Sequence, residues 1–352
     1  MAKSTFFTGQ PVFAQLCKYL DRDEILRIST ESGGERYRKS FDAWTHLLSM
    51  LYAVVMRFDS LREIEASALT FVSRMPHLQM SCVPKRSTLG DANAKRSESI
   101  FGDTYFSLLR AHRSRLLPDS RLNGLPGWLG RLKIIDSTTV TLFSNLVFRG
   151  VGRDPKIGKK KGGIKVHTVI SANEGVPGDI KFTSAATHDS FMLKPCDFDD
   201  GDVLAMDRAY IDYEKLEDLT QHGVTYVTKM KRNLTYETVS ESVLLDDGRY
   251  RNRSVRDVVF HKGATTHRAR IISYTETKTS RRGSKEQEVQ LLTNSHDLGV
   301  DEVIAIYQRR WQIESLFKQL KQNFPLRYFY GVSENAIKPQ IWVTPIANLL
   351  LT

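Results

Sequence analysis

The pattern of apolar residues changes near Arg131, and this change limits the folds open to the chain. Before it, apolar residues recur every three or four positions, as between Leu47 and Phe58, which is typical of amphipathic or buried helices. After it, β-branched and apolar residues form short runs that are typical of strands. The sequence therefore predicts a helical N-terminal part followed by a part that contains a sheet.

The N-terminal part, residues 1–125, is predicted to be a helical DNA-binding region. Ser60 and Glu63 have the spacing of a capping box and open the helix that follows Asp59. A third long helix is predicted from Ser87 through Leu109. Lys and Arg occur throughout this region, which fits a solvated helical face as well as it fits contact with DNA.

Residues 126–230 are predicted to form the first part of an α/β core. The expected strands, in chain order, are 132–142, 164–171, 179–184, 202–206 and 224–229. The first three form a meander with a turn at 173–175, and helices are expected from His188 and at 213–221. Hairpin strands followed by alternating helices and strands describe a mixed sheet covered by helices.

Residues 231–295 break this alternation with short strand-like runs between turns. The runs cover 236–239, 258–260, 268–274 and 288–293. From Lys229 to Lys285 there are 14 Lys and Arg against 6 Asp and Glu, so this stretch holds most of the chain's net charge of +11. A basic, β-rich block of this length is predicted to be an insertion with a function of its own. Residues 296–352 are expected to complete the core.

Composition excludes several classes of protein. The strongly basic balance indicates a polyanionic partner. The longest apolar run, 47–56, is half the length needed to cross a bilayer, so no membrane association is expected. Three widely spaced cysteines can form neither a disulfide framework nor a Cys-rich zinc site. The first residues lack the apolar stretch of a secretory signal, so we expect a cytoplasmic protein.

The segment 301–324 is predicted to be one long helix. At 100° per residue, Tyr307, Arg310, Glu314 and Lys321 fall within a stripe roughly 60° wide. The apolar residues fall on an adjacent face, so the helix is expected to pack on the sheet and to present this stripe at the domain edge. A surface ion pair between Arg310 and Glu314 would explain only two of the four residues.

The spacing Tyr-x2-Arg-x3-Glu-x6-Lys in this helix resembles the signature of the insertion-sequence-4 family of DDE transposases, often called the YREK group. The resemblance covers residues 134–351 and, more loosely, the helical N-terminus, which in this family is taken to bind the ends of the element. It implies a ribonuclease-H-like core with two catalytic Asp on strands and one Glu on a late helix. It also implies a β-rich insertion before that Glu, where residues 231–295 lie.

The resemblance places the catalytic and metal-binding carboxylates at Asp136, Asp207 and Glu314. Asp136 lies in the first expected strand, in Ile-Ile-Asp-Ser-Thr, and Asp207 follows the fourth, in Met-Asp-Arg-Ala-Tyr. A lone Asp at a strand end is more often a turn former, but two in these contexts favour the catalytic interpretation.

Three carboxylates suit hard cations, because Mg²⁺ and Mn²⁺ prefer oxygen ligands. We therefore expect two Mg²⁺ or Mn²⁺ ions per active site, roughly 3.5–4 Å apart, for in-line displacement at phosphorus. The same pair can activate water for hydrolysis or a 3′-hydroxyl for strand transfer. Without metal the carboxylates repel one another, so the empty site is expected to be poorly ordered.

Seven residues are predicted to contact DNA. They are Tyr307, Arg310, Lys321, Arg208, Lys160, Lys161 and Lys165. By the resemblance, the first three hold phosphates near the transposon end, and the fourth matches the Arg that follows the second catalytic Asp. The three lysines belong to a basic run before the strand 164–171, which fits DNA contact or an exposed loop.

Two other polar residues near the core strands have less specific predictions. Asp189 is expected to cap the helix that begins at His188, rather than to act as a further catalytic carboxylate. His167 is expected to be a satisfied strand residue rather than a ligand.

Some members of this family form a DNA hairpin, with an aromatic ring of the β-rich insertion stacked on a flipped base. The insertion here has no Trp. The available rings are Tyr236, Tyr250, Phe260 and Tyr274. Which of them serves, if any, stays open.

We expect a DNA transposase that binds the terminal inverted repeats of its insertion sequence, cleaves them and transfers the strands to target DNA. The resemblance also implies a homodimer on the paired ends and a bacterial cytoplasm, at the nucleoid when the protein is bound to DNA. The alternatives are a catalytically silent DNA-binding inhibitor and a stand-alone nuclease of the same fold. The chain ends in the apolar helical run 346–352, where family members continue, and this keeps the inhibitor open.

Overall fold

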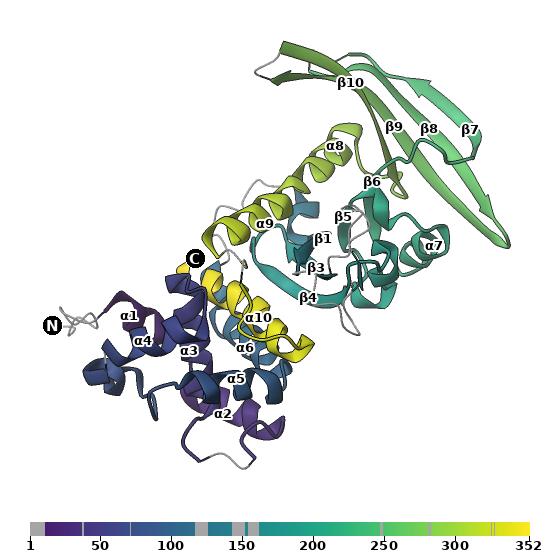
Figure 1. Ribbon diagram of the computed structural model, residues 1–352. Helices are drawn as coiled ribbons and strands as arrows, with labels where there is room; N and C mark the ends of the chain where they lie inside the picture. The colour runs from purple at the N-terminus through teal and green to yellow at the C-terminus, as the bar shows by residue number, and fades with distance from the viewer. Residues whose placement is uncertain are drawn as a thin grey trace. The chain divides into compact units, whose positions relative to one another are not determined.

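The computed structural model describes residues 11–36, 39–70, 72–116, 126–142, 152–153, 162–246, 249–280, 283–324, 326 and 328–352. The chain divides into two compact units (Figure 1). The helical unit comprises residues 1–117, 140–164 and 317–352, and the sheet unit comprises residues 118–139 and 165–316. The four-part division predicted from the sequence has other boundaries and stays a prediction.

Helices make up most of the described part of the helical unit. They are α1 (Val12–Cys17), α2 (Arg22–Glu31), α3 (Ala43–Met56), α4 (Leu61–Thr70), the 3₁₀ segment η1 (Val72–Leu78), α5 (Arg86–Lys95), α6 (Ser99–Leu116) and α10 (Glu334–Leu351). The last of these packs on α3, α5 and α6. Both it and α3 are buried over most of their length, because apolar residues occupy most of their positions.

The predicted long helix from Ser87 to Leu109 is wrong, because the chain forms two helices there. The break lies at Arg96, whose backbone is extended. Its guanidinium donates to the carbonyls of Gly34 and Asp42, at 3.1 and 3.3 Å. The Asn335 side-chain amide donates to the Arg96 carbonyl at 2.6 Å and to the carbonyls of Asn93 and Ala94 at the end of α5. Side chains that are distant in the sequence thus form hydrogen bonds with the backbone carbonyls at the end of α5.

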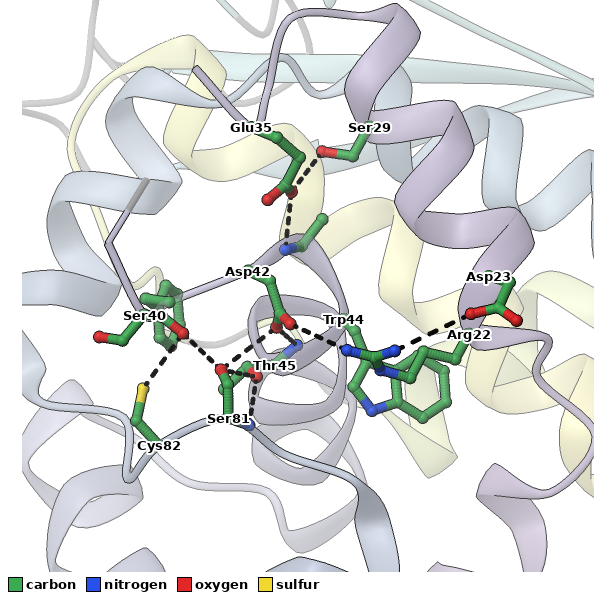
Figure 2. A network of polar contacts seen from close by, with 12 residues as sticks. Arg22, Asp23, Ser29, Glu35, Ser40, Asp42, Trp44, Thr45, Ser81 and Cys82 are labelled. Atoms are coloured by element: carbon green, nitrogen blue, oxygen red, sulfur yellow. Dashed lines mark hydrogen bonds and ion pairs between the residues drawn. The ribbon is translucent and has the colours of Figure 1, made fainter. Parts of the chain in front are cut away.

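Two carboxylates accept hydrogen bonds from the backbone amides in the first turn of α3, within a partly buried polar network (Figure 2). The Asp42 carboxylate accepts from the Thr45 amide at 2.8 Å and pairs with Arg22 at 3.5 Å. The Glu35 carboxylate accepts from the Ala43 amide at 2.9 Å. Because free amides at a helix start need acceptors, these two residues fix where α3 begins. The predicted capping of α4 is confirmed, since the Glu63 amide donates to Ser60 Oγ at 3.3 Å.

The strands of the described residues form one ten-stranded mixed sheet. Its strands are β1 (Leu132–Thr141), β2 (Gly152–Arg153), β3 (Gly162–Ser171), β4 (Pro177–Ser184), β5 (Val203–Met206), β6 (Thr225–Lys229), β7 (Glu237–Val243), β8 (Arg251–Lys262), β9 (Thr265–Ser280) and β10 (Gly283–Thr293). The order is β2-β3-β1-β5-β6-β10-β9-β8-β7, with β4 paired to β3. The predicted meander β1-β3-β4 is confirmed.

The centre of the sheet is parallel, with β5 between β1 and β6. All four residues of β5 are buried, as expected for a parallel strand covered on both faces. Helix α7 (Tyr213–Gln221) packs on β6 and β9, and helix α8 (Val300–Arg309) packs on β5, β6 and β10. The helix predicted from His188 is instead a short 3₁₀ turn, η3 (Asp189–Met192).

The basic block after β6 continues the same sheet. Strands β7 to β10 are antiparallel, and β10 joins the core through pairs such as Leu291 with Lys229 (Figure 1). The observed fold is thus a mixed α/β sheet with a helical N-terminal region. That the block is an insertion into a family core stays a prediction.

Among the described residues, none of the helices combines the length and the apolar character that crossing a bilayer requires.

Candidate active site

The register of the parallel strands brings two aspartates to one edge of the sheet. Ile135 of β1 pairs with Met206 of β5, so Asp136 and Asp207 each come directly after a member of this pair. The pairing of the two strands ends here, because β5 ends at Met206, whereas β1 continues past Asp136 to Thr141. The carboxyl end of a parallel strand is where α/β sheets usually bind ligands. The local sequence explains the placement, because apolar residues bury each strand up to the Asp.

The third carboxylate lies just after a break between two helices. The predicted single helix 301–324 is wrong: α8 ends at Arg309 and α9 (Trp311–Asn323) begins at Trp311. The amides of Arg310 and Ile313 bond to carbonyls three residues back, at 3.1 and 3.3 Å, which is the tighter pattern of a 3₁₀ turn. Hydrophobic periodicity cannot reveal such a turn, because both helices keep the same apolar side.

Arg310 joins two of the three predicted catalytic carboxylates. Its Nη1 lies 3.5 Å from Asp136 Oδ2, and its Nη2 lies 2.5 Å from Glu314 Oε1. The guanidinium carbon is 5.5 Å from the centre of the Tyr307 ring, and the side chain is only 14% exposed. Three residues of the predicted stripe therefore meet around one guanidinium beside Asp136.

Asp207 belongs to the same electrostatic environment. Burial raises the pKa of Asp136 to about 6; the Ser137 amide and Arg310 oppose this rise, and the negative charges of Asp207 and Glu314 add to it. Burial also raises the pKa of Tyr307, Arg310 opposes this, and Asp207 and Glu314 raise it further. The negative charges of Asp207 and Glu314 thus act on Asp136, and Arg310 compensates part of their effect.

The donor set fits hard divalent cations, because it consists of carboxylate oxygens. The described residues contain no group of three or more His, Cys, Asp or Glu arranged to hold a metal ion. The guanidinium of Arg310 contacts both Asp136 and Glu314. Arg310 Nε is buried and has no hydrogen-bond partner among the described residues.

Two of the other predicted DNA-binding residues lie at defined positions in the sheet unit. Lys165 is 13% exposed, because its ammonium lies 3.2 Å from Asp189 and donates to the Thr187 carbonyl at 2.7 Å. Arg208 begins the 3₁₀ turn η5 (Arg208–Tyr210) and lines a basic groove. Lys160 and Lys161 lie outside the described residues.

Lys321 lies in the part of α9 that belongs to the helical unit. There it lines a pocket of about 480 Å³ with Arg57 and Tyr328. Burial lowers its pKa.

The expectation for Asp189 needs correction, and that for His167 is confirmed at one of its two ring nitrogens. The His188 side chain accepts from the Ser190 amide and caps η3, while the Asp189 carboxylate accepts from Ser137 Oγ at 2.8 Å. His167 is satisfied at one nitrogen only: Nε2 bonds to Thr183 Oγ1 at 2.7 Å, whereas buried Nδ1 has no such partner among the described residues. Burial lowers the pKa of His167 to about 4.

Sequence analysis did not identify a basic groove of about 850 Å³. Its positive lining residues are Arg208, Lys229, Lys231, Arg232, Lys278 and Lys285. Lys278 of β9 stands directly opposite Lys285 of β10, and Glu276 relieves part of their repulsion, because its carboxylate lies 3.2 Å from the Lys278 ammonium. Burial lowers the pKa of Lys229, and the charges of Lys278 and Arg208 lower it further. The excess charge of this region was visible in the sequence, but its convergence depends on strand pairing.

The rings expected to serve as stacking candidates are mostly inaccessible. Tyr250, Phe260 and Tyr274 are buried. Tyr236 is half-buried, and its hydroxyl accepts from Arg256 at 3.2 Å. Of the four predicted rings, Tyr236 alone is exposed enough to remain a candidate for base stacking.

Comparison with known proteins agrees with a carboxylate site at the edge of a mixed sheet. Residues 127–350 match the family described as Transposase DDE domain, and residues 8–78 match a family described as a domain of unknown function (DUF4372). The chain therefore belongs to the DDE transposase family, and this family implies a ribonuclease-H-like fold.

Three curated relatives are transposases by name. A putative transposase, y4zB, of Sinorhizobium fredii is 27% identical over 274 residues, 76% of this chain and 71% of that protein. The probable transposase for insertion sequence element IS5377 of Geobacillus stearothermophilus is 26% identical over 229 residues, 62% and 55% of the two chains. The putative transposase for insertion sequence element IS4SA of Synechocystis is 27% identical over 276 residues, 75% and 70%.

Asp136→Asn is expected to stabilise the metal-free protein at pH 7 and to have little effect at pH 4. The pKa of Asp136 is about 6 in the folded protein, above that of an unfolded Asp, so the folded state binds more protons between these values. The free energy of unfolding of the natural protein therefore falls as the pH rises from about 4 to 6. Asn does not titrate, so the free energy of unfolding of the variant should exceed that of the natural protein by up to about 3 kcal/mol at pH 7.

Urea denaturation at both pH values, with a chelating agent present, measures this difference. A variant that gains no stability relative to the natural protein between pH 4 and pH 7 would contradict the assigned burial of Asp136.

Proposed function

We propose that this DNA transposase cuts and joins DNA at the ends of its insertion sequence with Asp136, Asp207 and Glu314 as catalytic carboxylates. One observation carries the assignment: Arg310 contacts both Asp136 and Glu314, which are far apart in the chain, while Asp207 follows the neighbouring strand at the same edge. Membership in the DDE family makes the protein a nucleotidyl transferase or nuclease, and the pattern Tyr307, Arg310, Glu314 and Lys321 supports the insertion-sequence-4 group.

We propose that the three carboxylates hold two Mg²⁺ or Mn²⁺ ions, since DDE transposases generally use divalent metals. Bound cations of this kind make a water or 3′-hydroxyl a better nucleophile and neutralise phosphate charge. Carboxylates must be ionised to bind them, so the raised pKa of Asp136 makes binding weaker below about pH 6.

Arg310 is proposed to exchange its partners when DNA binds. In the free protein its guanidinium neutralises Asp136 and Glu314. A DNA phosphate offers the same planar fork two oxygen acceptors, and buried Nε is still available as a donor. The Tyr307 ring beside the guanidinium limits its movement. Exchange of a carboxylate for a phosphate frees the carboxylates for cations as the substrate arrives.

The basic groove is proposed to carry the DNA backbone toward the carboxylates. It includes Arg208, which directly follows Asp207. Several lysines along one groove neutralise phosphates without reading sequence. Lys321, Lys160, Lys161 and Lys165 stay proposals for further phosphate contacts. Recognition of terminal inverted repeats, target DNA and a homodimer on paired ends are likewise proposed from the family.

Glu314→Gln is expected to abolish cleavage of DNA that carries the element's inverted repeats, while binding is retained. The change removes a proposed cation ligand but keeps the shape of the side chain. Loss of a ligand should cost more than the roughly 100-fold that loss of a ligand's hydrogen-bonding partner costs. Gel analysis of nicks in Mg²⁺, beside a binding assay, measures both effects.

Glu334→Gln is the matched control, because Glu334 also forms an i,i+4 ion pair, with Lys338 at 2.8 Å, but lies outside the proposed site. Unchanged cleavage by the Glu314 variant would remove this residue from the site. Scattered nicks by the natural protein would indicate a nuclease, and protection without nicks would indicate an inhibitor.

Replacing Lys278 and Lys285 together by Gln is expected to weaken DNA binding and its dependence on salt. Each phosphate contact contributes about 0.9 to the slope of log K against log salt concentration, so the slope should fall by about 2. The control is Arg268→Gln, an exposed position on β9 that does not line the groove. An unaltered slope in the double variant would exclude this groove as the DNA path.

A further inference from the structure

Asp189 lies where the segments that carry the two catalytic aspartates meet. It begins η3, which packs against η5, the turn that directly follows Asp207. Its Oδ1 accepts from the hydroxyl of Ser137, the residue after Asp136, at 2.8 Å. Asp189 therefore connects β1 with the turn that follows Asp207, since its carboxylate bonds to Ser137 and its segment η3 packs on η5.

We propose that Asp189 is a positioning residue that fixes Asp136 relative to Asp207 and so prepares the carboxylates to hold divalent cations. The proposal rests on the function proposed above for Asp136, Asp207 and Glu314. Asp189 itself is not proposed to be a ligand, because its Oδ1 is already occupied by the Ser137 hydroxyl and the Lys165 ammonium.

Ser137 links the two carboxylates through its two polar groups. Its amide donates to Asp136 Oδ1 at 2.8 Å, and its hydroxyl donates to Asp189 Oδ1 at 2.8 Å. The bond from the Ser137 amide orients the Asp136 carboxylate. The bond from the Ser137 hydroxyl to Asp189 holds Ser137 in place. Partners that orient a ligand in this way usually change metal affinity when they are lost.

Lys165 neutralises the negative charge that Asp189 adds near the catalytic carboxylates. Its ammonium lies 3.2 Å from Asp189 and also donates to the Thr187 carbonyl at 2.7 Å, which ties β3 to the chain before η3. His167 Nδ1 lies 3.8 Å from the same carboxylate oxygen. Asp189 is thus a paired, mostly buried carboxylate in a fixed position, which suits a structural anchor of the site.

Tyr210 provides independent support for the proximity of these groups. It ends η5 and is fully buried. Burial raises the pKa of its phenol, and the carboxylates of Asp189, Asp136 and Asp207 all raise it further. Asp189 and both catalytic aspartates therefore lie close enough to Tyr210 for their charges to act on its phenol.

The test compares Asp189→Asn and Ser137→Ala with Asp197→Asn in the full-length protein. Asp197 is a matched control, because it also pairs with a lysine, Lys181, at 2.6 Å, on the neighbouring turn η4 (Pro195–Asp197). The readouts are Mn²⁺ affinity of the DNA-free protein by electron paramagnetic resonance, the affinity for end DNA, and the cleavage rate of bound DNA.

We expect Asp189→Asn and Ser137→Ala to weaken Mn²⁺ binding and slow cleavage by about 10–100-fold each, with DNA affinity little changed. Ser137→Thr keeps the hydroxyl and should recover most of the loss seen in Ser137→Ala. If Asp189→Asn fails to fold because Lys165 is left unpaired, the double variant Asp189→Asn with Lys165→Met replaces it in the Mn²⁺ measurement only, because Lys165 is itself a proposed DNA contact.

The inference is overturned if the Asp189 variant, single or double, and Ser137→Ala bind Mn²⁺ as Asp197→Asn does, and if the single variants also cleave as it does. The result for the natural protein distinguishes failure of the Asp189 inference from failure of the proposed function. If the natural protein neither binds Mn²⁺ nor cleaves end DNA, the function proposed for the three carboxylates fails, and the role of Asp189 fails with it.

Discussion

The ion pairs of Arg310 are the interaction on which the candidate site depends. Asp136 is largely buried and close enough to Asp207 and Glu314 for their charges to raise its pKa, so the cluster needs a compensating positive charge. Arg310 supplies it at 3.5 Å from Asp136 and 2.5 Å from Glu314. The break between α8 and α9 is at Arg310, so the backbone itself changes geometry at the residue that holds the carboxylates together. The same residue is suited to a phosphate, which connects stability of the free protein with substrate binding.

The sheet explains why catalytic and basic residues occur side by side. Parallel pairing of β1 with β5 aligns Asp136 with Asp207, and β6 continues the sheet to the antiparallel block β7–β10. Lys229 at the end of β6 therefore shares a groove with Lys278 and Lys285 of the block. A single hydrogen-bonded sheet thus relates the proposed cutting site to the proposed backbone path.

Much of the fold could be predicted because its patterns are local. Periodicity located α3, β1, β3 and α7 to within a few residues, and the context Met-Asp-Arg indicated the acid that follows β5. Features that depend on distant partners could not be predicted in this way. The end of α5 depends on Asn335, and the partner of Asp189 is Ser137, 52 residues away.

The candidate site shows the same limit. The angular stripe correctly brought Tyr307, Arg310 and Glu314 together, because they lie within three turns. It could not show that the helix breaks at Arg310 or that Lys321 belongs to the other compact unit. Nor could charge counting show that Lys278 and Lys285 face each other, because that follows from the register of the hairpin.

Mn²⁺ binding to the DNA-free protein, followed by electron paramagnetic resonance, tests the central claim most directly when Arg310→Ala is compared with the natural protein. If Arg310 occupies the place of a cation between Asp136 and Glu314, the variant should bind Mn²⁺ at least about 10-fold more tightly, since a competing ion pair has been removed. Arg309→Ala, an exposed arginine one residue earlier, should bind as the natural protein does. Equal or weaker binding by Arg310→Ala would contradict a shared cation site at these carboxylates.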